Sequence, residues 1–439
     1  MPEVQPIVLA GADERDLTKL KEYRAIGGYD QLDRARAMEP AAIIEELNAS
    51  NLRGRGGAFF ATGRKAGFLA KGTGKPTYLV VNADESEPGT FKDREIMLRV
   101  PHRLIEGCLI MAYAIEADRV FIYLRGEYLD CFEVVRKALE RAHKDRLLGG
   151  VTIVVHRGAG AYICGEELAL LESLEGKRGQ PRSKPPYPAV TGLYAAPTLI
   201  NNVETIATVP KILELGGAEY AKIGTPDSTG TRVFCLSGNV VRGGNYELPH
   251  GTTIRELIYG IGGGIADDRQ LKAVIPGGSS FPILTADEID TRLTYDDLAR
   301  VGTFLGSGVV IAIDDRCCIV QLGLRVAQFY MHESCGKCTP CREGTRWMVQ
   351  LLEKIEAGLA EQSELDLLLS VCDQILGKCL CPLGDAAAMP IASYVSKFRQ
   401  EFQAHVDQAG CPLGGESSLE GLFAPVDQHT HHVVAEVPA

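Results

Sequence analysis

The chain has 439 residues, with 46 lysine and arginine residues against 57 aspartate and glutamate residues, which leaves a formal net charge of −11. This acidic balance argues against the basic surface by which proteins hold nucleic acid. Hydrophobic content of 45% and charged content of 23% predict two to four folded domains rather than a disordered chain. The best candidate for a membrane span, residues 104–115, is too short and contains Glu106. Residues 1–16 lack a basic segment followed by an apolar one, so we expect no secretory signal and expect any membrane to be reached through partners.

The first part of the chain predicts helices and a parallel α/β layer. A helical pattern at residues 41–52 runs into a loop of glycine and arginine at residues 52–65. Short apolar strands then alternate with helices, which is typical of a parallel sheet. The expected strands are residues 78–83, 119–124 and 151–156, and the expected helices are residues 104–115, 131–143 and 166–176.

The second part of the chain predicts a β-grasp unit and a helical bundle. A hairpin, a helix and a strand are expected at residues 233–238, 246–253, 254–261 and 271–278. Helices follow at residues 317–333, 345–359 and 364–376, and one of them carries a single apolar face of Met348, Leu351, Leu352, Ile355 and Leu359. We therefore expect five regions: residues 1–75, 76–230, 231–316, 317–410 and a C-terminal tail of 411–439.

Three of the thirteen cysteines stand in one run, SCGKCTPCREG. Cys335, Cys338 and Cys341 are spaced C-x2-C-x2-C, so one turn of chain presents three thiolates, as in chains that hold a [4Fe–4S] cluster. A fourth ligand must come from elsewhere, and spacing alone leaves Cys379 and Cys381 open. Zinc and unmetallated cysteines are the alternatives, although zinc sites usually pair two C-x2-C knuckles. Since we expect no export signal, we also expect these thiols to be in a reducing compartment.

Three glycine-rich or acidic loops are candidate ligand sites. Residues 156–167 join a strand to a helix through Gly158, Gly160 and Gly165, where phosphate approaches backbone N–H groups, although this run departs from G-x-G-x-x-G at Ile163. Glu166 and Glu167 either cap the helix or accept hydrogen bonds from a ribose or a flavin.

Residues 54–65 carry four glycines, Phe60 and Lys65, and suit a phosphate or a flavin, or form a plain surface loop. Asn82, Asp84, Glu85 and Glu87 follow an expected strand, where open α/β folds place ligands, and a solvated loop is the alternative.

Two other features carry less information. Cys317 and Cys318 stand in an apolar helical pattern, and core packing is the better interpretation. The histidines of the tail, His429, His431 and His432, lack the spacing of a ligand set, so we expect no metal there.

These runs together resemble one family, the NADH-binding, FMN-carrying subunit of bacterial NADH:quinone oxidoreductase, respiratory complex I. The matching runs are GRGG, NADESEPGTFKD, GAGAYICGEE, INNVET and ESCGKCTPCREGT, and they occur in the family's order over nearly the whole chain. The resemblance implies a Rossmann-like flavin domain, a ubiquitin-like β-grasp and a C-terminal helical bundle with the cluster.

The resemblance also implies site residues. Cys335, Cys338, Cys341 and Cys381 would ligate the [4Fe–4S] cluster. FMN would contact Gly54, Gly56, Gly57, Lys65, Asn82, Asp84, Gly165, Glu166, Asn201 and Asn202. Arg55, Glu85 and Tyr162 would be further cofactor contacts. NADH would contact Phe60, Phe68, Tyr187 and Lys184, with Glu87 and Glu167 near its ribose and nicotinamide ends.

Four positions depart from the family pattern. Phe59 replaces a usual glycine, Ala61 a proline, Ala66 a tryptophan and Tyr187 a phenylalanine. If position 59 requires a positive φ, phenylalanine there costs on the order of 1–2 kcal/mol.

The resemblance implies hydride transfer from NADH to FMN, then single-electron transfer through the cluster towards quinone, with no side chain acting as acid, base or nucleophile. It implies a small [2Fe–2S] subunit of the E type and a large iron–sulfur subunit of the G type as partners, on the cytoplasmic side of the inner membrane. A diaphorase subunit of a soluble NAD-linked hydrogenase or formate dehydrogenase shares every motif, although we expect such a chain to carry extra modules. A non-enzymatic β-grasp module with structural zinc is the alternative from another class.

Overall fold

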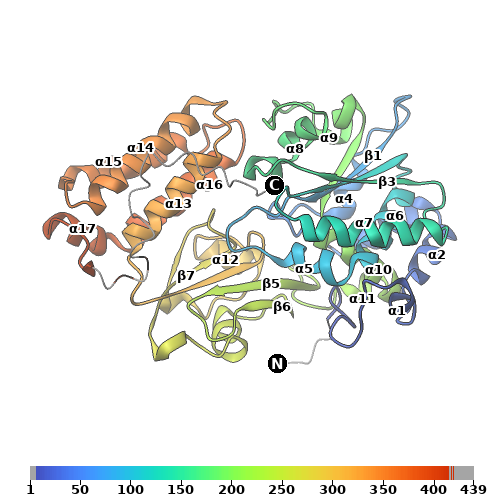
Figure 1. Ribbon diagram of the computed structural model, residues 1–439, viewed down its shortest axis with the longest axis horizontal. Helices are drawn as coiled ribbons and strands as arrows, with labels where there is room; N and C mark the ends of the chain where they lie inside the picture. The colour runs from blue at the N-terminus through green and yellow to red at the C-terminus, as the bar shows by residue number, and fades with distance from the viewer. Residues whose placement is uncertain (1–5, 415–416, 418, 420–439) are drawn as a thin grey trace, which may run out of the picture.

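The computed structural model describes residues 6–414, 417 and 419 (Figure 1). The tail histidines at positions 429, 431 and 432 lie outside the described residues. Within the described part of the chain, no helix combines the length and the apolar character that a membrane span needs.

A four-stranded parallel sheet organises the N-terminal half, in the order β3-β2-β1-β4. Its strands are β1 (Tyr78–Ala83), β2 (Arg119–Leu124), β3 (Thr152–Arg157) and β4 (Thr198–Asn202). The three predicted strands are confirmed, and β4 is an addition that sequence reasoning did not predict. Its five residues, TLINN, end in two asparagines, which are uncommon in strands and hid the apolar signal.

Helices cover both faces of this sheet because strand residues alternate between the faces. On one face Leu79, Val81 and Ile122 share a core with three helices: α6 (Pro101–Ala114), α7 (Leu129–Lys144) and α10 (Val203–Leu215). On the other face Val80 and Tyr123 pack with α8 (Glu167–Leu174) and with Cys341 of the cysteine run. The remaining helices of this half are α1 (Leu20–Arg24), α2 (Asp30–Arg36), α3 (Pro40–Ala49), α4 (Thr62–Gly67), α5 (Lys92–Arg99), α9 (Pro188–Thr191) and α11 (Gly217–Tyr220).

A five-stranded mixed sheet follows, in the order β6-β5-β9-β7-β8. The predicted hairpin is confirmed as an antiparallel pair of strands, and the predicted helix is a short π-helical turn at Glu256–Ile261. Strand β9 lies in the middle of the sheet and was not predicted, although its sequence VVIAID is apolar. The elements are β5 (Thr231–Gly238), β6 (Gly244–Pro249), β7 (Leu271–Pro276), β8 (Leu284–Thr285), β9 (Val309–Asp314) and α12 (Tyr295–Arg300).

Five helices form the C-terminal bundle, drawn in orange to red in Figure 1. They are α13 (Ile319–Glu333), α14 (Thr339–Glu356), α15 (Gln362–Ile375), α16 (Leu383–Lys397) and α17 (Arg399–Asp407). On α14 the side chains of Met348, Leu352 and Ile355 are buried as predicted. Leu359 was wrongly assigned to that face: it is 71% exposed because α14 ends three residues earlier, at Glu356.

A buried network of charges joins the parallel sheet to the mixed sheet. The Lys92 ammonium lies 2.8 Å from both Asp93 Oδ1 and Glu204 Oε2, and all three side chains are almost fully buried. Glu204 Oε1 accepts a hydrogen bond from the backbone N–H of Val233 on β5 at 2.9 Å. Burial alone would lower the pKa of Lys92, but Asp93 and Glu204 outweigh it and raise this pKa. The ion pair is thus part of the seam between the two sheets.

Candidate functional site

The first glycine loop, residues 54–65, closes against the junction of β4 and α10. The N–H of Gly54 donates to the carbonyl of Phe60 at 2.9 Å. Gly57 has φ +112°, which L side chains rarely adopt, and a Cβ on Gly56 would lie 3.1 Å from Cβ of Asn202. The loop backbone is therefore held close to the carboxyl edge of the parallel sheet, where such folds bind ligands.

Phe59 has φ +56°, so the condition stated for this position is met and its backbone is strained by about 1–2 kcal/mol. The ring lies 4.8 Å from the ring of Tyr295, centroid to centroid, and packs against the core of the mixed sheet. An aromatic pair of this kind contributes about 0.5–1.5 kcal/mol beyond its burial. The contact between the Phe59 and Tyr295 rings therefore offsets much of the backbone strain at position 59, which a glycine would not have.

The side chain of Arg55 points into the protein, so a cofactor contact at this position would involve its backbone. It is fully buried and donates to the carbonyls of Thr229 and Thr231 at 2.9 Å and to the hydroxyl of Tyr295 at 3.0 Å. A guanidinium with this many partners has few donors left for a phosphate. Sequence reasoning could not detect this, because arginine in a glycine loop is also typical of anion binding.

Lys65 and Lys184 share the carboxylate of Glu167. The Lys65 ammonium lies 3.4 Å from Glu167 Oε2 and donates to the carbonyl of Ile200 at 2.9 Å, whereas the Lys184 ammonium lies 2.6 Å from Glu167 Oε1. Burial would raise the pKa of Glu167, but the two lysines outweigh it and lower this pKa. The group therefore stays an anion with cations on both sides.

Glu166 caps helix α8. Its Oε2 accepts hydrogen bonds from the N–H groups of Leu168 and Ala169, at 2.9 and 2.8 Å. Of the two alternatives stated for this residue, N-capping is what its side chain does here. Its other oxygen, Oε1, lies 3.4 Å from the ammonium of Lys184.

Asn82 and Asp84 lie at the carboxyl end of β1. The amide of Asn82 donates to the carbonyl of Gly165 at 2.8 Å, which ties the end of β1 to the second glycine loop. Burial raises the pKa of Asp84 to about 7, against the hydrogen bond that Ser86 donates to it. A carboxyl with such a pKa is typical of a ligand site.

The Glu85 carboxylate is hydrogen-bonded to protein groups. It is buried, and its two oxygens accept from the N–H groups of Asp93 and Arg94, at 2.7 and 2.9 Å, at the start of α5. The Tyr128 hydroxyl also donates to it at 3.2 Å. These bonds use the acceptor sites that a ribose or flavin would need.

The Glu87 carboxylate is surrounded by hydrogen-bond donors, and the sequence analysis did not identify most of them. The Tyr162 hydroxyl donates to its Oε2 at 2.7 Å, and the N–H of Ser280 donates to its Oε1 at 2.8 Å. A Cβ on Gly278, which has φ +125°, would lie 2.6 Å from this carboxylate. Burial raises the pKa of Glu87 against these hydrogen bonds. The run PGGSS at residues 276–280 was the only sequence signal for these contacts with Glu87, and its pattern is typical of an ordinary turn.

Asn201 and Asn202 end β4 and differ in their partners. Asn202 Oδ1 caps α10 by accepting from the N–H of Glu204 at 2.9 Å, and its amide donates to Asp93 at 2.6 Å. The amide nitrogen of Asn201 is buried and has no hydrogen-bond partner in the described chain. Buried polar groups are normally paired, so this donor fits a bound polar group such as a flavin ring.

Three aromatic side chains stand exposed beside these loops. Phe60, Phe68 and Tyr187 are 44%, 54% and 59% exposed, which is unusual for residues with so much apolar area. The Phe60 and Phe68 rings lie 5.9 Å apart, centroid to centroid, and the Arg64 guanidinium lies about 6 Å from each. Flat exposed rings of this kind suit the stacking of an adenine.

The cysteine run packs on the second face of the parallel sheet. Cys338 is the N-cap of α14, and Cys341 is buried in its first turn, 3.1 Å from the hydroxyl of Ser334. Cys335, Cys338, Cys379 and Cys381 contact the same core as Val80 and Tyr123. The carbonyl of Cys335 accepts from the amide of Gln180 at 2.9 Å, so the loop before α9 closes over the run.

Both candidates for the fourth ligand lie beside the run. Cys379 Sγ lies 3.6 Å from the carbonyl of Ile375, and a Cβ on Gly384 would lie 2.3 Å from that sulfur. Burial raises the pKa of Cys379 and Cys381 to about 12, so either thiol needs a cation beside it to become a thiolate.

The spread of these thiols suits a cluster better than a single ion. A zinc ion needs four donors about 3.3–3.8 Å from one another. In the described chain, no three of these cysteine sulfurs lie within 4.8 Å of one another. A cube with iron atoms at its corners holds its thiolates further apart, so the donor set fits a [4Fe–4S] cluster.

Three family models match the chain. They are described as the Nuo51 FMN-binding domain, over residues 47–211, the SLBB domain, over residues 233–284, and the NADH-ubiquinone oxidoreductase-F iron-sulfur binding region, over residues 321–405. The first model spans both glycine loops, and the last spans the cysteine run.

Curated relatives resemble the chain over most of its length. An F-type subunit of NADH-quinone oxidoreductase from Rhizobium meliloti (strain 1021) is 49% identical over 418 residues, which are 93% of this chain and 99% of the relative. The F-type subunit of NADH-quinone oxidoreductase from Streptomyces coelicolor (strain ATCC BAA-471 / A3(2) / M145) is 48% identical, over 93% of this chain and 92% of the relative.

Two solved structures of an NAD+-reducing [NiFe]-hydrogenase resemble the chain in fold. The H2-reduced state gives a TM-score of 0.79 with 38% identity, over 84% of this chain and 63% of that one. The air-oxidized state gives a TM-score of 0.81 with 36% identity, over 91% of this chain and 66% of that one. The match thus leaves about a third of each hydrogenase chain uncovered.

Proposed function

Because the chain belongs to the family of F-type subunits of NADH-quinone oxidoreductase, we propose that it oxidises NADH with FMN and sends the electrons through a [4Fe–4S] cluster towards quinone, by way of partner subunits. The observation that carries the proposal is the convergence of both glycine loops, the orphaned amide of Asn201 and the cysteine run on one parallel sheet.

The proposed organisation follows the predicted regions. Residues 1–75 supply the N-terminal helices and the first glycine loop, and residues 76–230 form a Rossmann-like domain for FMN and NADH. Residues 231–316 form a ubiquitin-like β-grasp, residues 317–410 form the bundle with the cluster, and residues 411–439 form the tail.

The proposed FMN contacts are the two glycine loops and the ends of β1 and β4. The backbone of the first loop and Lys65 approach the phosphate, and Asn201 supplies its unused amide donor to the flavin ring. We retain as contacts Gly54, Gly56, Gly57, Lys65, Asn82, Asp84, Gly165, Glu166, Asn201 and Asn202, and assign the side chains of Arg55 and Glu85 to the protein interior.

The proposed NADH contacts are the exposed aromatic side chains and the paired carboxylates. Phe60, Phe68 and Tyr187 hold the adenine, and Lys184 lies near the nucleotide. Glu87, held by Tyr162, and Glu167 position the ribose and nicotinamide ends.

Bound FMN supplies the chemistry, since it accepts a hydride and releases single electrons to a one-electron carrier. The residues of this chain orient the nicotinamide and exclude water, and none acts as acid, base or nucleophile. Cys335, Cys338, Cys341 and Cys381 hold the cluster as thiolates, and the tight packing of Cys379 against Gly384 favours Cys381 as the fourth ligand.

The proposed partners are a small [2Fe–2S] subunit of the E type and a large iron–sulfur subunit of the G type. The proposed place is the cytoplasmic side of the bacterial inner membrane, reached through these subunits.

One experiment tests the proposal most directly. The purified chain is expected to be yellow-brown, with flavin absorbance and an EPR signal that appears on reduction with NADH. A colourless protein, or one that holds zinc at Cys335, Cys338 and Cys341, would contradict the proposal and favour a non-enzymatic module.

A diaphorase subunit is the second candidate, because the chain resembles an NAD+-reducing [NiFe]-hydrogenase at TM-scores of 0.79 and 0.81. Affinity purification from the native cell separates the candidates. We expect the E-type and G-type subunits to copurify, and recovery of a hydrogenase or formate dehydrogenase subunit instead would establish the diaphorase.

A further inference from the structure

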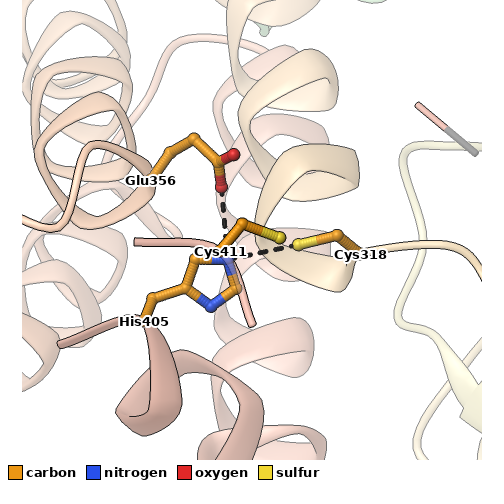
Figure 2. Close-up of side chains that lie close together, drawn as sticks. All are labelled: Cys318, Glu356, His405 and Cys411. Atoms are coloured by element: carbon orange, nitrogen blue, oxygen red, sulfur yellow. Dashed lines mark hydrogen bonds and ion pairs between the residues drawn. The ribbon is translucent and has the colours of Figure 1, made fainter. Parts of the chain in front are cut away.

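Four side chains with metal-binding atoms meet among the C-terminal helices (Figure 2). Cys318 is the N-cap of α13, Glu356 is the last residue of α14, His405 lies on α17, and Cys411 follows α17. One ligand atom from each lies within 4.8 Å of the other three. Among the described residues, no other set of histidine, cysteine and acidic side chains is this compact.

The distances in this group are those of ligands around one ion. His405 Nε2 lies 3.3 Å from Cys318 Sγ and 3.2 Å from Glu356 Oε2. Ligand atoms around a tetrahedral zinc ion are about 3.3–3.8 Å from one another. His405 is fully buried, and Cys318 is buried beside it, so the group is not a chance gathering of exposed acids.

The hydrogen bonds around the group leave two acceptor atoms, His405 Nε2 and Glu356 Oε2, facing each other. His405 Nδ1 lies 2.8 Å from the carbonyl of Glu401, which only accepts, so Nδ1 carries a proton. In the neutral ring Nε2 is then an acceptor, and it faces the carboxylate oxygen Glu356 Oε2, which is buried and receives no hydrogen bond. Two acceptors at 3.2 Å repel each other unless a proton or a metal ion lies between them.

The outer contacts also resemble those of a metal site. A ligating histidine usually donates its other ring nitrogen to a carbonyl or carboxylate, as His405 does to Glu401. Glu356 Oε1 accepts from the amide of Gln321 at 2.7 Å, which fixes the carboxylate with Oε2 turned towards the histidine. Cys318 Sγ accepts from the N–H of Gln321 at 3.5 Å, which fixes the sulfur at the start of the 15-residue helix α13.

We propose that Cys318, Glu356, His405 and Cys411 bind a structural zinc ion. Two thiolates and an imidazole select zinc over magnesium or calcium, which prefer oxygen ligands. Four protein ligands leave no open position, as in structural rather than catalytic zinc sites. Binding releases the two thiol protons, so the site with Zn2+, two thiolates, one carboxylate and a neutral imidazole carries a net charge of −1.

Such an ion would hold the end of the bundle together. The ligands come from α13, α14, α17 and the segment after α17, and only α14 also carries the cysteine run. Cys317 and Cys318 lie in the buried core, as predicted, and the inference adds a ligand role for Cys318. It does not depend on the proposed function, since it concerns a different set of ligands.

Metal analysis of the purified full chain tests the proposal. We expect about one zinc ion per chain in addition to the cluster iron, and we expect Cys411→Ala and His405→Ala to lose the zinc while they keep flavin and iron. His405→Cys retains a zinc-binding ligand set and is expected to keep the metal. Cys317→Ala is the matched control beside Cys318, and it is expected to retain full zinc content.

A second measurement identifies the zinc ligands directly. X-ray absorption at the zinc edge of the wild-type chain is expected to show two sulfur ligands at about 2.3 Å and nitrogen or oxygen ligands at about 2.0 Å. This measurement stands even if the alanine variants fail to fold. A wild-type chain without zinc after growth in zinc-supplemented medium, iron in this site, a disulfide between Cys318 and Cys411, or full zinc content in Cys411→Ala would each overturn the proposal.

Discussion

At the scale of single residues, the unused amide of Asn201 is the sharpest probe of the flavin site. Asn201→Ala removes a donor that has no partner in the described part of the protein, so we expect the affinity for FMN to fall by about 5–30-fold, or 1–2 kcal/mol. Fluorescence titration of the flavin-depleted chain with FMN measures this affinity. Asn245→Ala is the control, because the amide of Asn245 already donates to Glu95 at 2.6 Å. Unchanged FMN affinity in Asn201→Ala would remove this residue from the site.

Asp84 makes a prediction about pH. Its pKa is raised by burial to about 7 from an ordinary 3.8, so between about pH 4 and 7 the folded chain holds a proton that the unfolded chain has lost. Stability therefore falls as pH rises through this window. In the flavin-depleted chain we expect Asp84→Asn to gain about 1–3 kcal/mol over wild type between pH 5 and pH 8, measured by thermal melting. Melting curves that stay parallel across this range would contradict the prediction.

Glu167 bears on the choice of nucleotide. Carboxylates beside the ribose repel a 2′-phosphate, so we expect kcat/KM for NADH to exceed that for NADPH by at least about 10-fold. We expect Glu167→Gln to narrow this ratio, whereas Glu172→Gln on the same helix leaves it unchanged. Comparable kcat/KM for the two nucleotides in the wild-type chain would refute the assignment.

At the scale of elements, the buried pair of Lys92 and Glu204 joins α5 to α10. Lys92→Met leaves the Glu204 carboxylate buried without its cation, so we expect a loss of about 3–5 kcal/mol. The double variant Lys92→Met with Glu204→Leu is expected to recover part of that loss, because Glu204 is then no longer a buried charge, whereas Asp93 still lacks its ammonium partner. Thermal melting of the four chains of this cycle measures both effects. A Lys92→Met chain as stable as wild type would show that the pair contributes little.

The sequence predicted most of the elements whose pattern is uninterrupted, although the apolar strand β9 was not predicted. Strands β1, β2 and β3 are apolar runs between helices, and each was found. Helix α16 was missed because Pro382 and Pro390 break its pattern, and β4 because it ends in asparagines. The site divides in the same way: motif residues were found, but the Arg55 side chain is turned inward by partners distant in sequence. The Glu85 side chain is held by N–H groups at the start of α5. Ser280 and Tyr330 reach Glu87 only through the folding of three separate regions.

At the scale of the whole molecule, the cysteine run rests on the sheet that carries the glycine loops. Cys338→Ala is expected to abolish the reduced-cluster EPR signal but to spare ferricyanide reduction by NADH, since the flavin contacts come from other elements. Cys372→Ala, which lies elsewhere in the bundle, serves as the control and retains the signal. A normal cluster signal in Cys338→Ala would contradict the assignment of Cys338 as a cluster ligand.

The buried charges between the sheets also limit how the molecule can be taken apart. Arg55 of the first glycine loop donates to the carbonyls of Thr229 and Thr231, and Glu204 accepts from Val233. A fragment that stops at residue 230 would thus expose to solvent a guanidinium, an ammonium and carboxylates that are buried in the full chain. The regions are best regarded as parts of one cooperative folding unit, so a truncated version designed at the boundary of residues 230 and 231 is expected to be insoluble.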